Sequence, residues 1–113
     1  MRAATIRDGR IEVAEHPDPE PQDGQLLVRV RAAGLNGADM LQLAGKYPAP
    51  PGAPADIPGL EVAGEVVACG RRVVRFEPGD RVMAIVSGGG QAELAVVHER
   101  TAMPIPDELD WIA

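Results

Sequence analysis

The chain has 113 residues, of which 45% are hydrophobic and only 3% aromatic, and its formal net charge is −6. This length suits one domain with a single core, filled by aliphatic side chains. The acidic balance disfavours binding to nucleic acid or to an anionic membrane surface, and no apolar run is long enough to span a membrane. The single cysteine, Cys69, cannot form an internal disulfide. We therefore expect a cytoplasmic protein.

The first third of the chain predicts a hairpin and then a longer strand. Residues 3–7 and 11–15 flank Asp8-Gly9, a sequence typical of tight β-hairpin turns. Three prolines place residues 16–23 in a loop. In residues 25–33, small apolar side chains alternate with arginines, which predicts a half-buried strand.

A short helix is predicted next, followed by a long loop. Asn36 is a good N-cap, Asp39 stands three positions later as in a capping box, and Gly45 suits the residue just beyond the helix. Residues 46–58 contain five prolines and cannot be regular structure. A loop of this length is usually functional.

The remainder predicts more short strands and a β architecture. We expect strands at residues 61–69, 73–76, 81–86 and 91–98, separated by turns rich in glycine, and the first turn of a helix at 106–108. Together with the hairpin and residues 25–33, this makes about seven strands and one short helix. The fold class is therefore mainly β, as a small barrel or a partly open sandwich.

Five segments in this order resemble the N-terminal catalytic domain of the medium-chain dehydrogenase/reductase superfamily. The closest branch is the zeta-crystallin-like quinone oxidoreductases, including the p53-inducible type. The segments are Ala33-Gly34-Leu35-Asn36-Gly37-Ala38-Asp39, Ala44-Gly45-Lys46-Tyr47-Pro48, Gly59-Leu60-Glu61-Val62-Ala63-Gly64, Gly79-Asp80-Arg81-Val82 and Gly88-Gly89-Gly90-Gln91-Ala92-Glu93. The resemblance covers residues 1–113 and implies one GroES-like domain, a small β-barrel with one or two short helices.

The superfamily normally continues into a Rossmann domain that binds the dinucleotide, and we expect that domain to be absent from this chain. The glycines at 88–90 are not its nucleotide-binding turn, because they join two predicted strands and precede no helix. Zinc-dependent members carry a cysteine where Asn36 stands and a histidine where Leu60 stands. Since neither replacement suits zinc, we expect no metal site.

The resemblance also implies the reaction and the site residues. Zinc-free members transfer a hydride from NADPH to a quinone or an activated alkene. Asn36, Tyr47 and Leu60 would then contact the cofactor, and Asn36, Asp39, Tyr47 and Glu61 would line the substrate pocket. Tyr47 is the catalytic candidate, because its hydroxyl can donate a hydrogen bond to a carbonyl that gains charge during hydride addition.

Each of these residues also has a purely structural interpretation. Asn36 and Asp39 would cap the helix, and Tyr47 would pack on neighbouring prolines. Glu61 would be a buried carboxylate paired with an arginine such as Arg81. Leu60 would be apolar lining only.

Two functions therefore stay open. The first is the substrate-binding half of an NADPH-dependent quinone or enone oxidoreductase, with a Rossmann domain in cis or in trans; the 113-residue chain alone would then be inactive. The alternative is a stand-alone, non-catalytic GroES-like domain that binds a small molecule or a protein partner and buries its open face as a homo-oligomer. The preference for NADPH over NADH follows from the resemblance alone.

Overall fold

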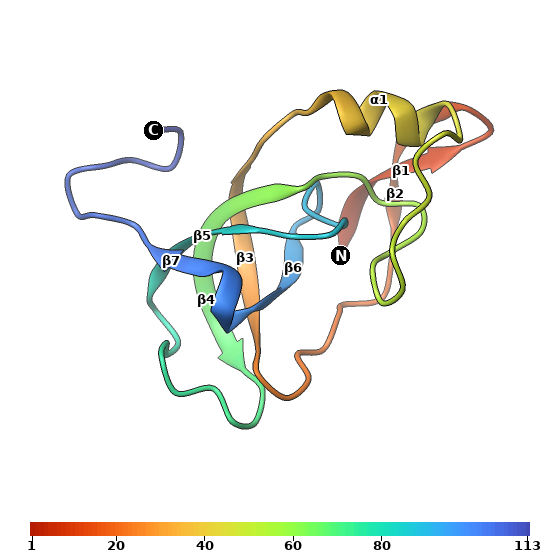
Figure 1. Cartoon of the computed structure of the whole chain (residues 1–113). Coiled ribbons are helices and arrows are strands. Elements are labelled where there is room, and N and C mark those ends of the chain that lie inside the picture. Colours follow the sequence, from red (N-terminus) through yellow and green to blue (C-terminus); the bar gives the residue numbers. More distant parts are fainter.

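The computed structural model describes residues 1–113 and consists of two antiparallel sheets with one short α-helix (Figure 1). Strands β1 (Arg2–Arg7) and β2 (Arg10–Glu15) form a separate hairpin. The larger sheet has the order β6-β3-β4-β5-β7, and its strands are Gln25–Ala33 (β3), Glu61–Cys69 (β4), Arg81–Ile85 (β5), Leu94–His98 (β6) and Ala102–Pro104 (β7). The mainly β prediction is confirmed, but the two sheets stay open and do not close into a barrel.

The hairpin turn has the conformation that its sequence predicts. Asp8 and Gly9 both have positive φ, at 51° and 72°. Positive φ at both central residues defines the turn that follows the right-handed twist of the strands, and Asp-Gly adopts it at little cost.

The core lies on one face of the larger sheet. It consists of small aliphatic residues from alternate positions of the strands: Leu26, Val28, Val62, Val66, Val82, Ala84, Val97 and Ala102. The alternation predicted for β3 is confirmed at Val28, which is fully buried, and at Arg29, which is exposed. The pairing of β3 with β4 shifts in register between Val30 and Ala32, but the alternation of burial continues to the end of the strand.

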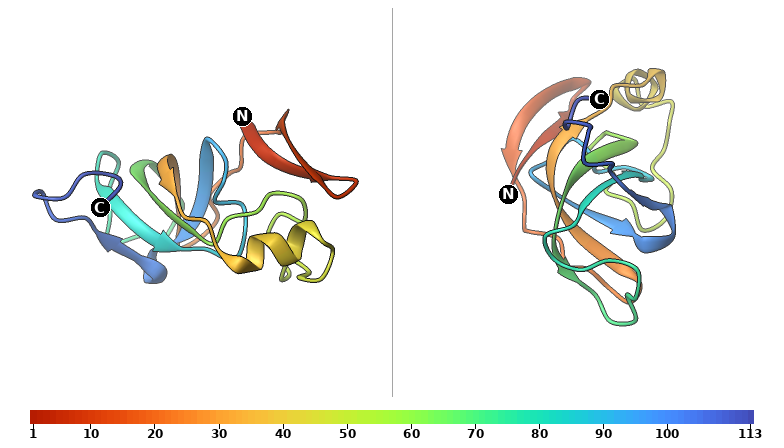
Figure 2. Two further views of the ribbon diagram at one scale, coloured as in Figure 1. Left: turned by 90° about the horizontal axis from the view of Figure 1, so that it is seen from above. Right: turned by 90° about the vertical axis from the view of Figure 1, so that its left-hand side faces the viewer.

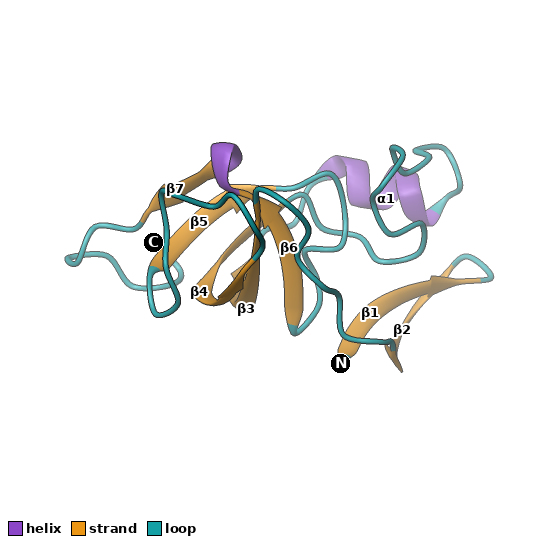
Figure 3. Cartoon of the chain, turned by 90° about the horizontal axis from the view of Figure 1, so that it is seen from below, coloured by secondary structure: helices purple, strands orange, loops and turns teal.

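The hairpin and helix α1 (Gly37–Leu43) occupy one end of an elongated molecule, and the C-terminal segment occupies the other (Figures 2 and 3). Main-chain hydrogen bonds of residues 91–93 join the hairpin to the larger sheet. The N–H of Ala4 donates to the carbonyl of Gln91 at 2.9 Å, and the N–H of Glu93 donates to the carbonyl of Arg2 at 3.0 Å. The carbonyl of Glu93 in turn accepts from Val30 at 2.9 Å. This segment therefore fixes where the hairpin lies.

Several predicted elements are wrong. Residues 73–76 are not a strand, because the N–H groups of Val74 and Arg75 donate to the buried carboxylate of Glu99 and not to a neighbouring strand. The strand expected from residue 91 begins at Leu94, and residues 106–108 form a turn rather than a helix. The 3₁₀ turn Glu99–Thr101 and strand β7 were not predicted. No helix of the chain has the length and apolar character that crossing a membrane requires.

Candidate functional site

Helix α1 begins and ends as its sequence predicts. Asn36 is the N-cap, in an extended conformation, and its backbone N–H donates to Oδ2 of Asp39 at 2.9 Å. At the other end Gly45 has a φ of 75° and donates to the carbonyl of Gln42, while Lys46 donates to the carbonyl of Leu41 at 2.7 Å. This is the Schellman arrangement that closes many helices.

The carboxylate of Asp39 is the centre of a small polar cluster. The residue is only 7% exposed. Its Oδ2 accepts both the Asn36 N–H and, at 3.2 Å, the side-chain amide of Gln91, which is 52 residues further along the chain. Sequence reasoning assigned no role to Gln91, although it follows the triple glycine in one of the segments that carry the resemblance.

Two buried polar atoms of this cluster have no hydrogen-bond partner. They are Nδ2 of Asn36 and Oδ1 of Asp39. The Asp39 N–H donates to the Asn36 backbone carbonyl at 3.0 Å and so does not use the Asn36 Nδ2. A buried donor and a buried acceptor are thus free at the start of α1.

Glu61 lies beside the turn that leads into α1. Its carbonyl accepts the N–H of Gly34 at 3.2 Å, and its side chain covers that glycine. The prediction of a buried carboxylate paired with Arg81 is wrong: Glu61 is exposed, and Arg81 instead donates to the carbonyl of Leu109 at 2.7 Å and lies 4.5 Å from the ring centroid of Trp111. The outward register of Glu61 on β4 explains the difference.

Neither Tyr47 nor Leu60 makes a hydrogen bond to the cluster. Tyr47 is half-buried just beyond the C-terminus of α1, whereas Asn36 precedes its N-terminus. A seven-residue helix, about 10 Å long, separates them. The hydroxyl of Tyr47 makes no hydrogen bond within the chain. Leu60 is half-buried, and its carbonyl accepts the N–H of Val86 at 2.9 Å.

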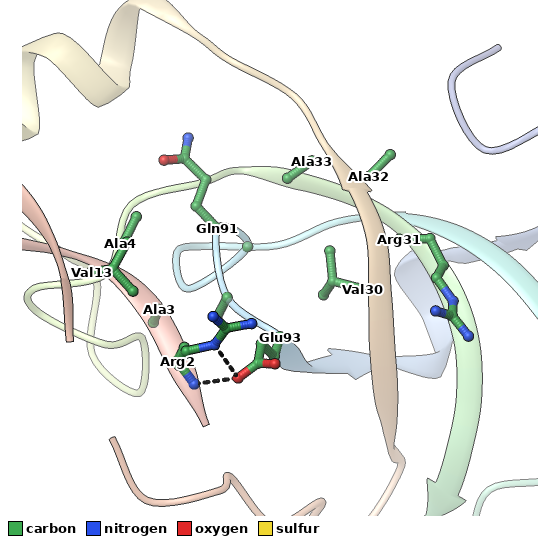
Figure 4. A pocket seen from close by; sticks show the side chains of 12 residues that line it. Arg2, Ala3, Ala4, Val13, Val30, Arg31, Ala32, Ala33, Gln91 and Glu93 are labelled. Atoms are coloured by element: carbon green, nitrogen blue, oxygen red, sulfur yellow. Dashed lines mark hydrogen bonds and ion pairs between the residues drawn. The ribbon is translucent and has the colours of Figure 1, made fainter. Parts of the chain in front are cut away.

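An open hollow of about 410 Å³ lies between the hairpin, β3 and residues 90–93 (Figure 4). Gln91 lines it, so one side chain both borders the hollow and holds Asp39. Arg2 and Glu93 form an ion pair at its edge, and the Arg2 N–H that donates to Glu93 lowers the pKa of that carboxyl. None of the site residues predicted from the sequence lines the hollow.

The donor set for a metal is poor. No three histidine, cysteine, aspartate or glutamate side chains lie close enough to share an ion. Leu60 offers no ligand atom, and the amide of Asn36 is a weak ligand for zinc. The residues present therefore do not fit a catalytic zinc ion.

Comparison with known proteins agrees with this geometry. Residues 22–107 match the family model of the alcohol dehydrogenase GroES-like domain. A quinone oxidoreductase from Pseudomonas aeruginosa is 42% identical over 103 residues, which cover 89% of this chain and 31% of that protein. The crystal structure of the human synaptic vesicle membrane protein VAT-1 homolog-like protein superposes with a TM-score of 0.89 at 36% identity, covering 98% of this chain and 37% of the other.

A quinone oxidoreductase from Thermus thermophilus, solved also as its complex with NADPH, superposes with a TM-score of 0.77 at 34% identity over 98% of this chain and 34% of the other. The chain spans between 22% and 31% of the length of the curated relatives it matches at 38–42% identity. The chain therefore belongs to the alcohol dehydrogenase GroES-like domain family, in the zeta-crystallin-like branch of the medium-chain dehydrogenases/reductases.

Proposed function

We propose that this domain forms the substrate-side wall of the active-site cleft in an NADPH-dependent quinone or enone oxidoreductase. A Rossmann domain, in cis or in trans, supplies the opposite wall. The relatives named quinone oxidoreductase, and the NADPH complex of one of them, support the proposal. The poor donor set at Asn36 and Leu60 supports a reaction that does not depend on zinc.

The observation that carries the proposal is the unpartnered pair at the start of α1. A buried polar group without a hydrogen bond costs about 1–3 kcal/mol. Nδ2 of Asn36 offers a donor and Oδ1 of Asp39 an acceptor, and neither atom is used within the chain. A carbonyl of a quinone matches the donor and a hydroxyl of a ribose matches the acceptor, and binding requires a side-chain movement that uncovers these two buried atoms.

The remaining candidates act by contact and orientation. NADPH, when bound, supplies the hydride. Asn36 donates to the ribose or to the substrate carbonyl, Leu60 and Glu61 line the base of the cleft, and Tyr47 donates its unused hydroxyl to the oxygen that gains charge. Hydride transfer needs positioning rather than a strong base, which fits a site that holds no catalytic dyad or triad.

The test uses the full-length polypeptide and follows NADPH oxidation with a series of p-benzoquinones and enones. We expect turnover by the full-length protein and none by the 113-residue chain alone, with activity returning when a Rossmann half is added in trans. Tyr47→Phe removes one donor to the developing negative charge and lowers kcat about 100-fold. Asn36→Ala lowers kcat/KM by about 10-fold or more.

The opposite result is equally clear. Robust turnover by the 113-residue chain alone contradicts the two-domain requirement. A stable homo-oligomer of this chain with no affinity for NADPH, together with an inactive full-length protein, identifies the domain as a non-catalytic binding module.

A further inference from the structure

We infer that Gln91 is a positioning residue for the proposed site: its side-chain amide holds the Asp39 carboxylate, which binds the Asn36 backbone, and so fixes the free acceptor of Asp39 relative to the free donor of Asn36. The inference rests on the proposed function for its catalytic consequence. Its structural part concerns this chain alone and is tested separately.

The first step is that the two oxygens of the Asp39 carboxylate differ in their hydrogen bonds. Oδ2 accepts two hydrogen bonds, from the Asn36 N–H at 2.9 Å and from Nε2 of Gln91 at 3.2 Å. Oδ1 accepts none and is buried. Two donors on one oxygen fix the rotation of the carboxylate, and the other oxygen is left without a hydrogen-bond partner.

The second step concerns Asn36. An asparagine at an N-cap ordinarily uses its side-chain oxygen to satisfy the first free N–H groups of the helix. Here the Asp39 carboxylate also closes the start of the helix by accepting the Asn36 N–H, as in a capping box. Capping uses the side-chain oxygen, so the Asn36 Nδ2 is left without a partner in either arrangement, and Gln91 acts by holding the carboxylate that binds the Asn36 backbone.

The third step is that Gln91 is itself held from two other sides. Its backbone N–H donates to the carbonyl of Pro58 at 2.9 Å, directly before the segment that carries Leu60 and Glu61. Its carbonyl accepts the N–H of Ala4 from β1. Three segments distant in sequence thus meet at Gln91, so its side chain sets α1 against the start of β4.

The first experiment is independent of activity. Amide NMR spectra of the 113-residue chain are compared for the wild type, Gln91→Met and Gln91→Glu. The matched control is Gln22→Met, because Gln22 is exposed and its side chain makes no hydrogen bond. We expect the backbone and side-chain signals of Asn36 to move in both Gln91 variants and to stay in place in the control. Unmoved Asn36 signals in a folded Gln91 variant overturn the inference.

The second experiment measures quinone reduction by the full-length enzyme. Loosening a ground-state contact raises KM, so we expect KM for the quinone to rise about 5- to 30-fold in Gln91→Met with kcat within about twofold. In an Asp39→Ala background the same change adds little, since residues that act through one another are not additive. Unchanged kinetics alongside shifted Asn36 signals overturn the positioning role. An inactive wild type refutes the proposed function instead, and the spectra still decide the role of Gln91.

Discussion

The side chain of Glu61 occupies the space that a side chain on Gly34 would need. A Cβ atom at Gly34 would lie 1.9 Å from Oε1 of Glu61 and 2.6 Å from its Cγ. The same two residues share the hydrogen bond from the Gly34 N–H to the Glu61 carbonyl. The bare backbone at Gly34 is therefore what allows the glutamate to fold over the entry to α1.

Alanine at Gly34 and alanine at Gly64 have different expected costs. At Gly34 the clash is with an exposed, flexible glutamate that can swing into water, so Gly34→Ala costs less than about 1 kcal/mol. At Gly64 the added Cβ would lie 2.1 Å from the backbone carbonyl of Arg29, which cannot move without disturbing β3, and the cost is about 2–3 kcal/mol. Urea denaturation of both variants checks the order. Equal losses of unfolding free energy in the two variants would contradict this interpretation of the two glycines.

Loss of the Glu99 carboxylate should release the segment before β5. Glu99 is 8% exposed and accepts the N–H groups of Val74 and Arg75 at 3.2 and 3.1 Å. We expect Glu99→Ala to destabilise the fold by about 1–2 kcal/mol and to speed hydrogen exchange at these two amides, since both lose their acceptor. Glu108→Ala, at an exposed turn, is the control. Exchange at Val74 and Arg75 that does not change would show that Glu99 is not their anchor.

The ion pair between Arg2 and Glu93 predicts that the stability of the fold depends on pH. The Arg2 N–H, its side chain and its charge lower the pKa of Glu93 from the usual 4.5. A lowered folded pKa stabilises the protein above the unfolded value, and this contribution is lost as the pH falls through the folded pKa. Glu93→Gln should therefore have a lower melting temperature than the wild type near neutral pH. The difference between the two melting temperatures should shrink progressively below about pH 4.5.

Thermal unfolding across this range, with and without added salt, is the measurement for Glu93. Added salt should reduce the difference in melting temperature, because the Glu93 side chain is half exposed and its charge is screened. If the difference in melting temperature stays constant down to acid pH, lost packing and not lost charge explains the lower stability of the variant.

The contact of Arg81 with Trp111 should be visible by fluorescence. The guanidinium lies 4.5 Å from the ring centroid and also holds the Leu109 carbonyl. A contact of this kind is worth about 0.5–1 kcal/mol. We expect Arg81→Ala to shift the emission of the single tryptophan to the red as residues 109–113 loosen. Arg75→Ala, which removes a cation over Phe76 instead, should leave the emission unchanged. No difference between the two variants would contradict the contact.

Local signals account for the parts of the fold that could be predicted. The Asp8-Gly9 turn, the cap at Asn36 and the closing glycine at Gly45 each depend on a few neighbouring residues, and each is confirmed. The strand at residues 61–69 has the predicted bounds, because a mostly apolar run ends at the turn that begins with Gly70.

Long-range pairing accounts for what could not be predicted. Residues 73–76 are as apolar as a strand, but their N–H groups are taken by Glu99, more than twenty residues away. Gln91 meets Asp39 across 52 residues, a contact that no local pattern encodes. For Glu61, the sequence indicated neither its outward register nor its closeness to Gly34, since both depend on how β4 pairs.

The hairpin is attached to the rest of the domain mainly through backbone groups, beside small side chains such as Ala3, which is 3% exposed. An attachment of this kind depends little on which side chains the hairpin carries. Mutations that change most exposed residues of the hairpin should accumulate freely over evolutionary time, while a bulky residue at Ala3, or a proline that removes the Ala4 N–H, should be eliminated by selection.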